Sequence, residues 1–225
     1  MRQWTQENFW KNIIWRRLGN TETYKIIKKF ITKDEVNQIV TWVDSVNHNG
    51  NDSNHHLTEL SKTLNGKSYV FDISNTSLTN YITKFQSISD VSKEPLPDFI
   101  YKIIDSISEE FNFPKDNIFL QAVDMAKGGK INPHYDASID GYINYKCNIS
   151  VLSENYDFFV GDESINIEKT DLYAFEASLY KHWTNEFNSR RVLLSFGFVL
   201  PYEVLNRTEN EPRVRLSKRI GRYFQ

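Results

Sequence analysis

A histidine and an aspartate stand two residues apart in the segment NPHYDASIDG (132–141), just after a double glycine. If this segment is a strand, both side chains share one face, because alternate residues of a strand point to the same side. A His-x-Asp pair alone is weak, since about half of chains with this content of histidine and acid would contain one by chance. His182, in SLYKHWT, is the one other histidine outside the polar segment 47–66. It could complete a ligand set with His134 and Asp136.

Two imidazoles and one carboxylate on one side of a metal, with the other side open, are typical of non-haem Fe(II) oxygenases. Cys147 is the single cysteine of the chain, which excludes an intramolecular disulfide and any thiolate-rich zinc or iron–sulfur site. The sequence therefore predicts His134, Asp136 and His182 as ligands of Fe(II). The open positions would take a chelating cosubstrate and O2.

An arginine opens the last predicted strand, RRVLLSFGFVL. Alternation gives this strand an apolar face and a second face that points to the interior, with Arg191, Leu193, Ser195 and Gly197. An arginine inside a barrel is costly unless an anion pairs with it. A dicarboxylate cosubstrate would supply the anion, and Ser195 could add a hydroxyl donor. Arg190 would lie on the opposite face, although a bulge would reverse the assignment.

Helical patterns come first along the chain and short strands follow. Besides a short strand at 23–30, hydrophobic periodicity predicts helices at 5–17, 32–46, 77–88 and 97–112. Thr32 and Glu35 form a capping box at the start of the second helix. Later runs of β-branched and aromatic residues predict strands near 117–124, 131–136, 143–152, 156–160, 164–168, 171–176, 179–184 and 191–200. This order favours an α+β domain whose β half is a sandwich or a barrel.

Length, charge and composition limit the domain number, the partners and the compartment of the protein. The 225 residues suit one domain (1–225), with a mainly helical support region at 1–112, a lid-like loop at 47–66, a β core at 113–200 and a tail at 201–225. A net charge of −2 gives no general electrostatic case for nucleic acid or membrane as a partner. The N-terminus lacks a secretory signal pattern, so the expected compartment is the cytoplasm. The basic tail segment RVRLSKRIGRYFQ is interpreted as a docked terminal segment rather than a nucleic-acid handle.

Taken together, the sequence resembles the 2-oxoglutarate/Fe(II)-dependent dioxygenases, in particular their prolyl-hydroxylase-like branch. The resemblance rests on HYD at 134–136, on His182, and on Arg191 with Ser195, and extends loosely upstream to YKIIKKFITKDEVNQIV. It implies a double-stranded β-helix (jelly-roll, cupin-like) core with the N-terminal helices packed on one sheet. It departs from that branch near Asp124, where a tyrosine that contacts the cosubstrate often stands.

The resemblance implies a hydroxylase that uses Fe(II), 2-oxoglutarate and O2 on a C–H bond of an amino-acid, peptidyl (prolyl included) or related small substrate, releasing succinate and CO2. Arg191, Ser195 and Asn148 would bind 2-oxoglutarate; Lys146 and Ser150 share the inward face of Asn148. Beyond the metal ligands no catalytic residue is expected. Tyr135, Tyr142 and Trp183 are predicted to shape the substrate pocket. Two alternatives stay open: an oxidative demethylase of nucleic acid, and a non-redox cupin-like protein that binds a metal or ligand. The sequence indicates neither the substrate nor the oligomeric state.

Overall fold

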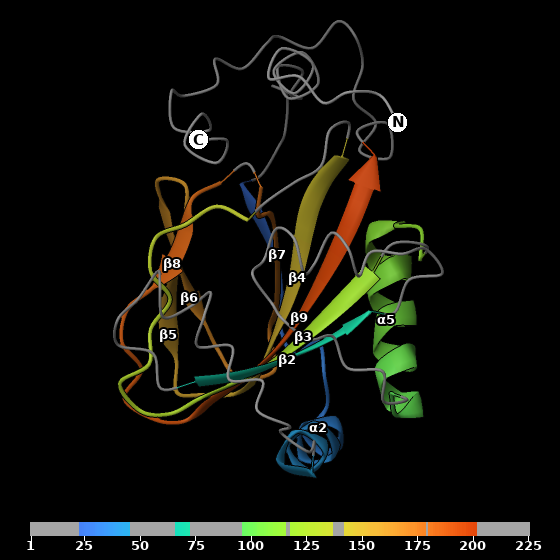
Figure 1. Ribbon diagram of the computed structural model, residues 1–225, viewed down its shortest axis with the longest axis horizontal. Coiled ribbons are helices and arrows are strands. Elements are labelled where there is room, and N and C mark those ends of the chain that lie inside the picture. Colours follow the sequence, from blue (N-terminus) through green and yellow to red (C-terminus); the bar gives the residue numbers. More distant parts are fainter. Residues whose placement is uncertain are drawn as a thin grey trace, which may run out of the picture.

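The computed structural model describes residues 23–45, 66–72, 96–115, 118–136, 142–178 and 180–201. Within these residues the chain forms two helices and two antiparallel sheets (Figure 1). The elements are β1 (Tyr24–Ile27), α2 (Lys33–Ser45), β2 (Gly66–Asp72), α5 (Asp98–Phe111), β3 (Ile118–Met125), β4 (Tyr142–Leu152), β5 (Tyr156–Val160), β6 (Glu163–Ile167), β7 (Leu172–Glu176), β8 (His182–Thr184) and β9 (Arg191–Pro201).

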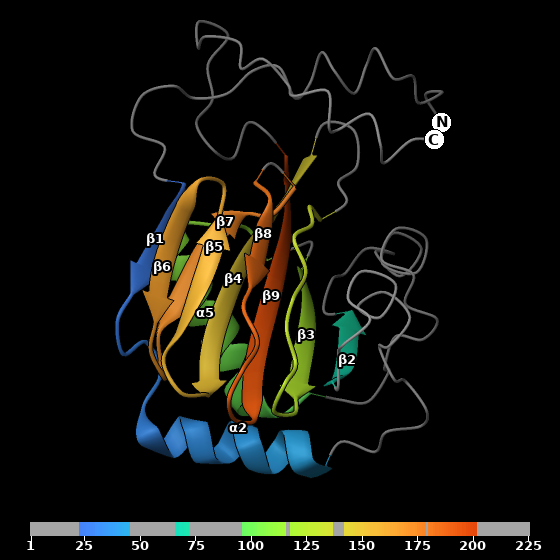
Figure 2. The same cartoon turned by 90° about the vertical axis from the view of Figure 1, so that its left-hand side faces the viewer.

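The two sheets lie face to face. The larger has the order β1-β7-β4-β9-β3-β2, and the smaller has the order β6-β5-β8 and stands in front of it in Figure 2. An isolated bridge pairs His134 with His182, so the segment around residue 134 extends the smaller sheet beyond β8. From β3 to β9 the chain crosses repeatedly between the two sheets, with β5 and β6 as a hairpin in the smaller one. This connectivity is that of a jelly-roll-like fold.

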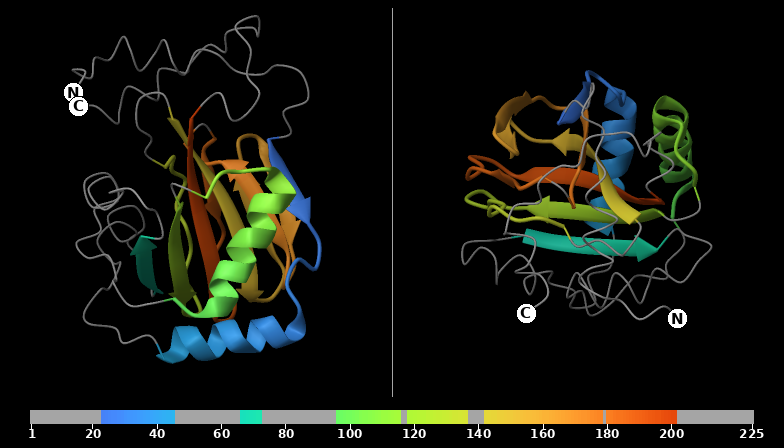
Figure 3. Two further views of the ribbon diagram at one scale, coloured as in Figure 1. Left: turned by 90° about the vertical axis from the view of Figure 1, so that its right-hand side faces the viewer. Right: turned by 90° about the horizontal axis from the view of Figure 1, so that it is seen from above.

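The described helices cover the outer side of the larger sheet. Helix α5 runs across its outer face, and α2 crosses the ends of its strands (Figure 3). The capping box of α2 is present, with Glu35 N–H donating to Thr32 Oγ1 and Thr32 N–H donating to Glu35 Oε2. Helix α5 ends at Asn112, which adopts a left-handed conformation (φ 53°) and donates its N–H to carbonyls of the last turn.

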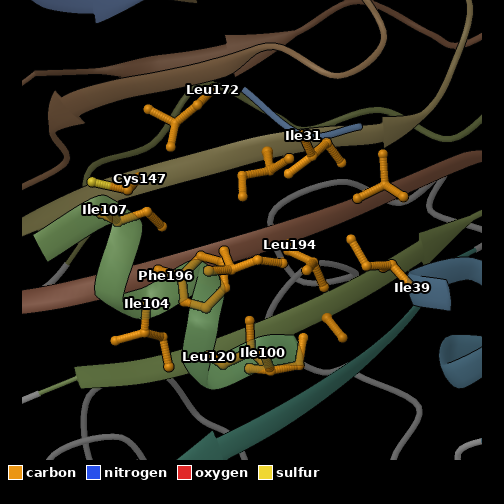
Figure 4. Close-up of a cluster of buried hydrophobic side chains, with 14 of the residues drawn as sticks. Ile31, Ile39, Ile100, Ile104, Ile107, Leu120, Cys147, Leu172, Leu194 and Phe196 are labelled. Atoms are coloured by element: carbon orange, nitrogen blue, oxygen red, sulfur yellow. The ribbon is translucent and has the colours of Figure 1, made fainter. Parts of the chain in front are cut away.

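Apolar side chains fill both sides of the larger sheet. On the outer side, residues of α5 and α2 pack against β3, β4, β7 and β9. Figure 4 labels ten members of this cluster: Ile31, Ile39, Ile100, Ile104, Ile107, Leu120, Cys147, Leu172, Leu194 and Phe196. A second cluster lies between the sheets and includes Phe158, Phe175 and Leu193. The two faces of β9 therefore separate as its alternation predicts, with Leu194 and Phe196 outward and Leu193 inward.

Most of the predicted elements that fall on described residues are confirmed. The strand predicted at 131–136 is wrong as a strand, because only His134 makes a ladder contact, the bridge to His182. The strand Gly66–Asp72 was not predicted; it pairs with β3 at the edge of the larger sheet. The helices predicted at 5–17 and 77–88 lie outside the described residues. So do the predicted loop at 47–66 and tail at 201–225, except for Gly66, which begins β2, and Pro201, which ends β9. No helix in the described part of the chain is long and apolar enough to cross a membrane.

Candidate metal centre

Backbone pairing brings the two histidines together. His134 donates its N–H to the His182 carbonyl (3.2 Å), and His182 donates its N–H to the His134 carbonyl (2.9 Å). The segment is also tied at Asp136, whose N–H donates to the carbonyl of Ala177 (2.9 Å). As a result, one ligand atom from each of His134, Asp136 and His182 lies within 4.8 Å of the others. The structure thus brings together the three residues that the sequence predicts as metal ligands.

The ring orientation of both histidines is fixed by backbone carbonyls. His134 Nδ1 lies 2.7 Å from the Asn132 carbonyl, and His182 Nδ1 lies 3.0 Å from the Tyr180 carbonyl. Because a carbonyl oxygen only accepts, each Nδ1 must carry the proton, and in the neutral ring Nε2 keeps its lone pair. The two Nε2 atoms face Asp136 Oδ1 at 3.4 Å and 3.7 Å. A backbone carbonyl on the remote nitrogen is the usual support of a metal-binding histidine.

The carboxylate between the histidines is ionised. Burial alone acts to raise the pKa of Asp136, but the opposing effect of nearby positive charge, with the Lys146 ammonium first, outweighs it, so the pKa lies well below its ordinary value. Burial and the neighbouring His134 lower the pKa of His182 to about 3. Near neutral pH the site therefore presents a carboxylate and the uncharged His182 ring. This is the protonation state that a divalent metal requires.

A cavity of about 70 Å³ opens beside these three side chains. Apolar residues form much of its wall, among them Val123, Phe158 and Leu193. Its polar lining is grouped on the larger sheet and consists of Gln121, Lys146, Asn148 and Ser195. Gln121 and Asn148 flank Ser195 as its register partners on β3 and β4. Two of the predicted cosubstrate ligands, Ser195 and Asn148, thus line the cavity.

Arg191, the third predicted cosubstrate ligand, is fully buried behind this wall. Its Nη2 donates to the hydroxyls of Tyr156 (2.9 Å) and Tyr173 (3.0 Å), and its Nη1 lies 3.7 Å from the sulfur of Met125. Rings of Tyr156 and Phe187 stack on the guanidinium at 4.6 Å and 4.7 Å. Among the described residues no carboxylate pairs with it, and its Nε has no hydrogen-bond partner. Met125 both lines the cavity and contacts Arg191.

Arg190 points to the other side of the sheet, as the alternation of β9 predicts. It forms ion pairs with Asp124 (2.8 Å) and Asp44 (2.5 Å). These hydrogen bonds, with Asp124 first, raise the pKa of Arg190 above its ordinary value. In the prolyl-hydroxylase-like branch a tyrosine often stands near the position of Asp124. Here the Asp124 carboxylate pairs with Arg190 and is not among the described residues that line the cavity.

Tyr135 and Trp183, two of the residues predicted to shape a substrate pocket, are not among the described residues that line the cavity. Trp183 stacks on Phe159 with ring centroids 4.9 Å apart, on the opposite face of β8 from His182. Tyr135 is half-buried, and the side chain of Tyr142 lies outside the described part of the structure. Their role in substrate binding stays a prediction.

Sequence reasoning did not single out several residues that the fold brings to the site. Lys146 was noted only for its inward face, and its ammonium lies 3.4 Å from Asp136 Oδ2. Asn144 Nδ2 donates to the same oxygen (3.2 Å). Tyr156 and Tyr173 carry the hydroxyls that meet Arg191. Strand alternation places Asn144 and Lys146 on the inward face, but only the three-dimensional register shows which group each one meets.

Comparison with known proteins shows the fold. No known family model matches the sequence, and no curated protein matches it. A Trichoplax adhaerens prolyl hydroxylase, solved with a hypoxia inducible factor oxygen degradation domain peptide fragment, is similar at a TM-score of 0.56 and 11% identity, over 88% of this chain and 93% of that chain. OsALKBH1 is similar at a TM-score of 0.56 and 13% identity, over 80% and 99% of the two chains.

A third solved structure is the viral collagen prolyl hydroxylase of Paramecium Bursaria Chlorella virus-1 in a 2OG complex. It has a TM-score of 0.51 and 11% identity, over 80% of this chain and 97% of that chain. At these identities the likeness establishes a shared jelly-roll-like fold.

Proposed function

We propose that this protein is an Fe(II)- and 2-oxoglutarate-dependent oxygenase that hydroxylates a C–H bond of an amino-acid, peptidyl or related small substrate and releases succinate and CO2. The observation that carries the proposal is the orientation of the ligand atoms. His134 and His182 each have Nδ1 tied to a carbonyl, and both Nε2 atoms converge with Asp136 Oδ1 at a cavity. Three electron-pair donors at this separation repel one another unless a cation lies between them.

The donor set fits the implied metal. Two imidazole nitrogens and one carboxylate oxygen suit Fe(II), and this set leaves coordination positions open. Bound there, Fe(II) would supply the activation of O2. The protein residues hold the ligand geometry, while Val123, Phe158 and Leu193 keep the adjoining wall apolar and exclude water.

The cavity also fits the proposed cosubstrate. A volume of about 70 Å³ gives room for about five water molecules. Ser195 and Asn148 offer polar groups on its wall. Arg191 lies behind this wall. It is a buried cation that pairs with no described carboxylate, and such a cation favours the binding of an anion. Met125 has a flexible, unbranched side chain, and its displacement would open the path from the cavity to the guanidinium.

For the substrate, a peptidyl or amino-acid group is favoured over nucleic acid. One structure of similar fold was solved with a peptide fragment bound. The nucleic-acid alternative depends on the basic tail, residues 213–225, which lies outside the described residues. It would be supported if binding of DNA or RNA fell steeply with salt and was lost on removal of that tail.

The proposal is tested by anaerobic titration calorimetry of the purified protein, first with Fe(II) and then with 2-oxoglutarate. We expect one Fe(II) site, and 2-oxoglutarate binding that depends on the metal. Asp136→Ala should weaken the metal affinity by more than about 100-fold, because it removes a ligand rather than a supporting contact. Absence of Fe(II) binding, or equal binding by the variant, would rule out this centre. Metal binding with no binding of 2-oxoglutarate would favour the non-redox alternative.

A further inference from the structure

Lys146 is a buried cation on the wall of the cavity. It is 5% exposed, and it projects from the inward face of β4. It is the one lysine or arginine among the described residues that line the cavity. Lysine is almost never buried to this degree without partners, because removing its charge from water is expensive. Lys146 has such a partner in Asp136, so its burial depends on that carboxylate.

The surrounding residues are shaped to hold the ammonium at this point. Gly197 on β9 pairs with Phe119 on one side and with Lys146 on the other. A Cβ at Gly197 would lie only 2.1 Å from the Phe119 ring, so the missing side chain lets that ring lie across β9. The ring centroid is 4.6 Å from Lys146 Nζ, within range of a cation–π contact. Gly197 thus makes room for the Phe119 ring, and that ring contacts the ammonium that faces Asp136.

The carboxylate that neutralises Lys146 also belongs to the candidate metal centre. Lys146 Nζ meets Asp136 Oδ2 at 3.4 Å, while Oδ1 of the same carboxylate faces both histidines. Once a divalent cation binds at Oδ1, one negative charge is shared by a dication and an ammonium. The buried surplus is then positive on the cavity side of the metal. A surplus of this kind attracts an anionic ligand and disfavours a neutral one.

We propose that Lys146 receives the carboxylate that a 2-oxo acid presents at the metal, and thereby makes the centre selective for 2-oxo acids. This inference rests on the proposed function and assigns one carboxylate of the cosubstrate to each of two cations. Lys146 binds the carboxylate beside the metal, and Arg191 binds the far carboxylate. The cavity is small enough that any ligand filling it beside Asp136 comes within reach of Lys146.

Two ligands separate the two cations. Pyruvate has the 2-oxo acid end of 2-oxoglutarate but lacks the far carboxylate. Calorimetry under anaerobic conditions, with Mn(II)-loaded protein, compares both acids on the wild type and on Lys146→Met. We expect the variant to lose affinity for pyruvate and for 2-oxoglutarate by the same factor, about 10-fold or more, as for a lost charge-assisted hydrogen bond. Lys25→Met, which removes a partly exposed lysine paired with Glu110, is the matched control and should change neither affinity.

The metal affinity of Lys146→Met distinguishes this role from a structural one. Removing a positive charge beside a dication should leave Mn(II) affinity unchanged or raise it, whereas a disrupted site would bind both the metal and the acids more weakly. Lys146→Gln is a second neutral variant that keeps a donor for Asp136; it takes the place of Lys146→Met if that variant does not fold.

The outcomes separate the inference from the function on which it rests. Failure of the wild type to bind Mn(II) or 2-oxoglutarate overturns the proposed function. Wild-type binding with unchanged affinities in both neutral variants overturns the role of Lys146 alone. A selective loss of 2-oxoglutarate, with pyruvate unaffected, overturns it as well, because Lys146 would then serve the far carboxylate.

Discussion

At the scale of single residues, the candidate centre depends on which atoms are donors. His134 and His182 matter because a carbonyl holds each Nδ1 and leaves Nε2 toward Asp136. The residue types and the i, i+2 spacing of His134 and Asp136 predict that they share a site. The tautomers could not be predicted, since they depend on the carbonyls of Asn132 and Tyr180, whose directions are set only by the folded backbone.

Adjacent arginines provide a matched test at this scale. Arg191 is buried without a described carboxylate partner, whereas Arg190 is already paired with Asp124 and Asp44. Arg191→Leu should therefore lower the affinity of the metal-loaded protein for 2-oxoglutarate by about 10- to 100-fold, the worth of a charged hydrogen-bonded pair. Arg190→Leu should leave it within about 2-fold, because its partners lie on the other face of the sheet. Calorimetry measures both, and an inverted order would contradict the assignment.

At the scale of secondary-structure elements, the alternation in β9 is the most informative pattern in the sequence. It correctly separates Leu194 and Phe196, which face the helices, from Leu193, which faces the smaller sheet. The segment 131–136 was harder, because the alternation of His134 and Asp136 comes from an irregular stretch held by one bridge. β2 was missed because an edge strand pairs on one side only and needs no continuous apolar run.

Close packing between β3 and β9 predicts a sharp response at Gly197. Gly197→Ala places a methyl group inside the Phe119 ring and should destabilise the protein by about 1–3 kcal/mol, as overpacking does. Urea unfolding measures the change. Phe119→Leu removes the clash, so the double variant should be more stable than the sum of the single effects predicts. Strict additivity would show that the two residues are not in contact.

The turn between β6 and β7 is tied to the end of β1 through one buried carboxylate. Asp171 is 1% exposed and accepts hydrogen bonds from Lys28 Nζ (2.8 Å), Lys29 N–H (3.3 Å) and Glu168 N–H (2.9 Å). Asp171→Ala leaves these donors without their acceptor and should cost about 1–3 kcal/mol of unfolding free energy. The exposed Asp157 provides the control, where Asp157→Ala should stay within about 0.5 kcal/mol. Equal effects in urea unfolding would contradict this role.

At the scale of the whole molecule, the sole cysteine reports on the outer core. Cys147 is fully buried between the larger sheet and α5 (Figure 4). Burial raises the pKa of its thiol well above the ordinary value, so the thiol stays protonated as pH rises to 9. Native protein should therefore label with a maleimide only through unfolding, and far more slowly than the same protein in denaturant. Rapid labelling without denaturant would contradict the packing of this core.

The arrangement of strands in the whole fold determines features of the site that could not be predicted from the sequence. The jelly-roll-like topology sets β3, β4 and β9 side by side, so Gln121, Ser195 and Asn148 form one row across three strands. Such rows depend on strand register, which local patterns do not encode. The solved structures of similar fold share only 11% to 13% identity with this chain, so the fold is similar where the sequences are not.

The most direct test of the proposed centre is a crystal structure of the protein grown anaerobically with Mn(II) and 2-oxoglutarate. We expect one metal held by Nε2 of His134, one oxygen of Asp136 and Nε2 of His182. We also expect 2-oxoglutarate in the cavity, with its far carboxylate on Arg191. A metal bound elsewhere, or these three side chains without a metal at saturating Mn(II), would contradict it.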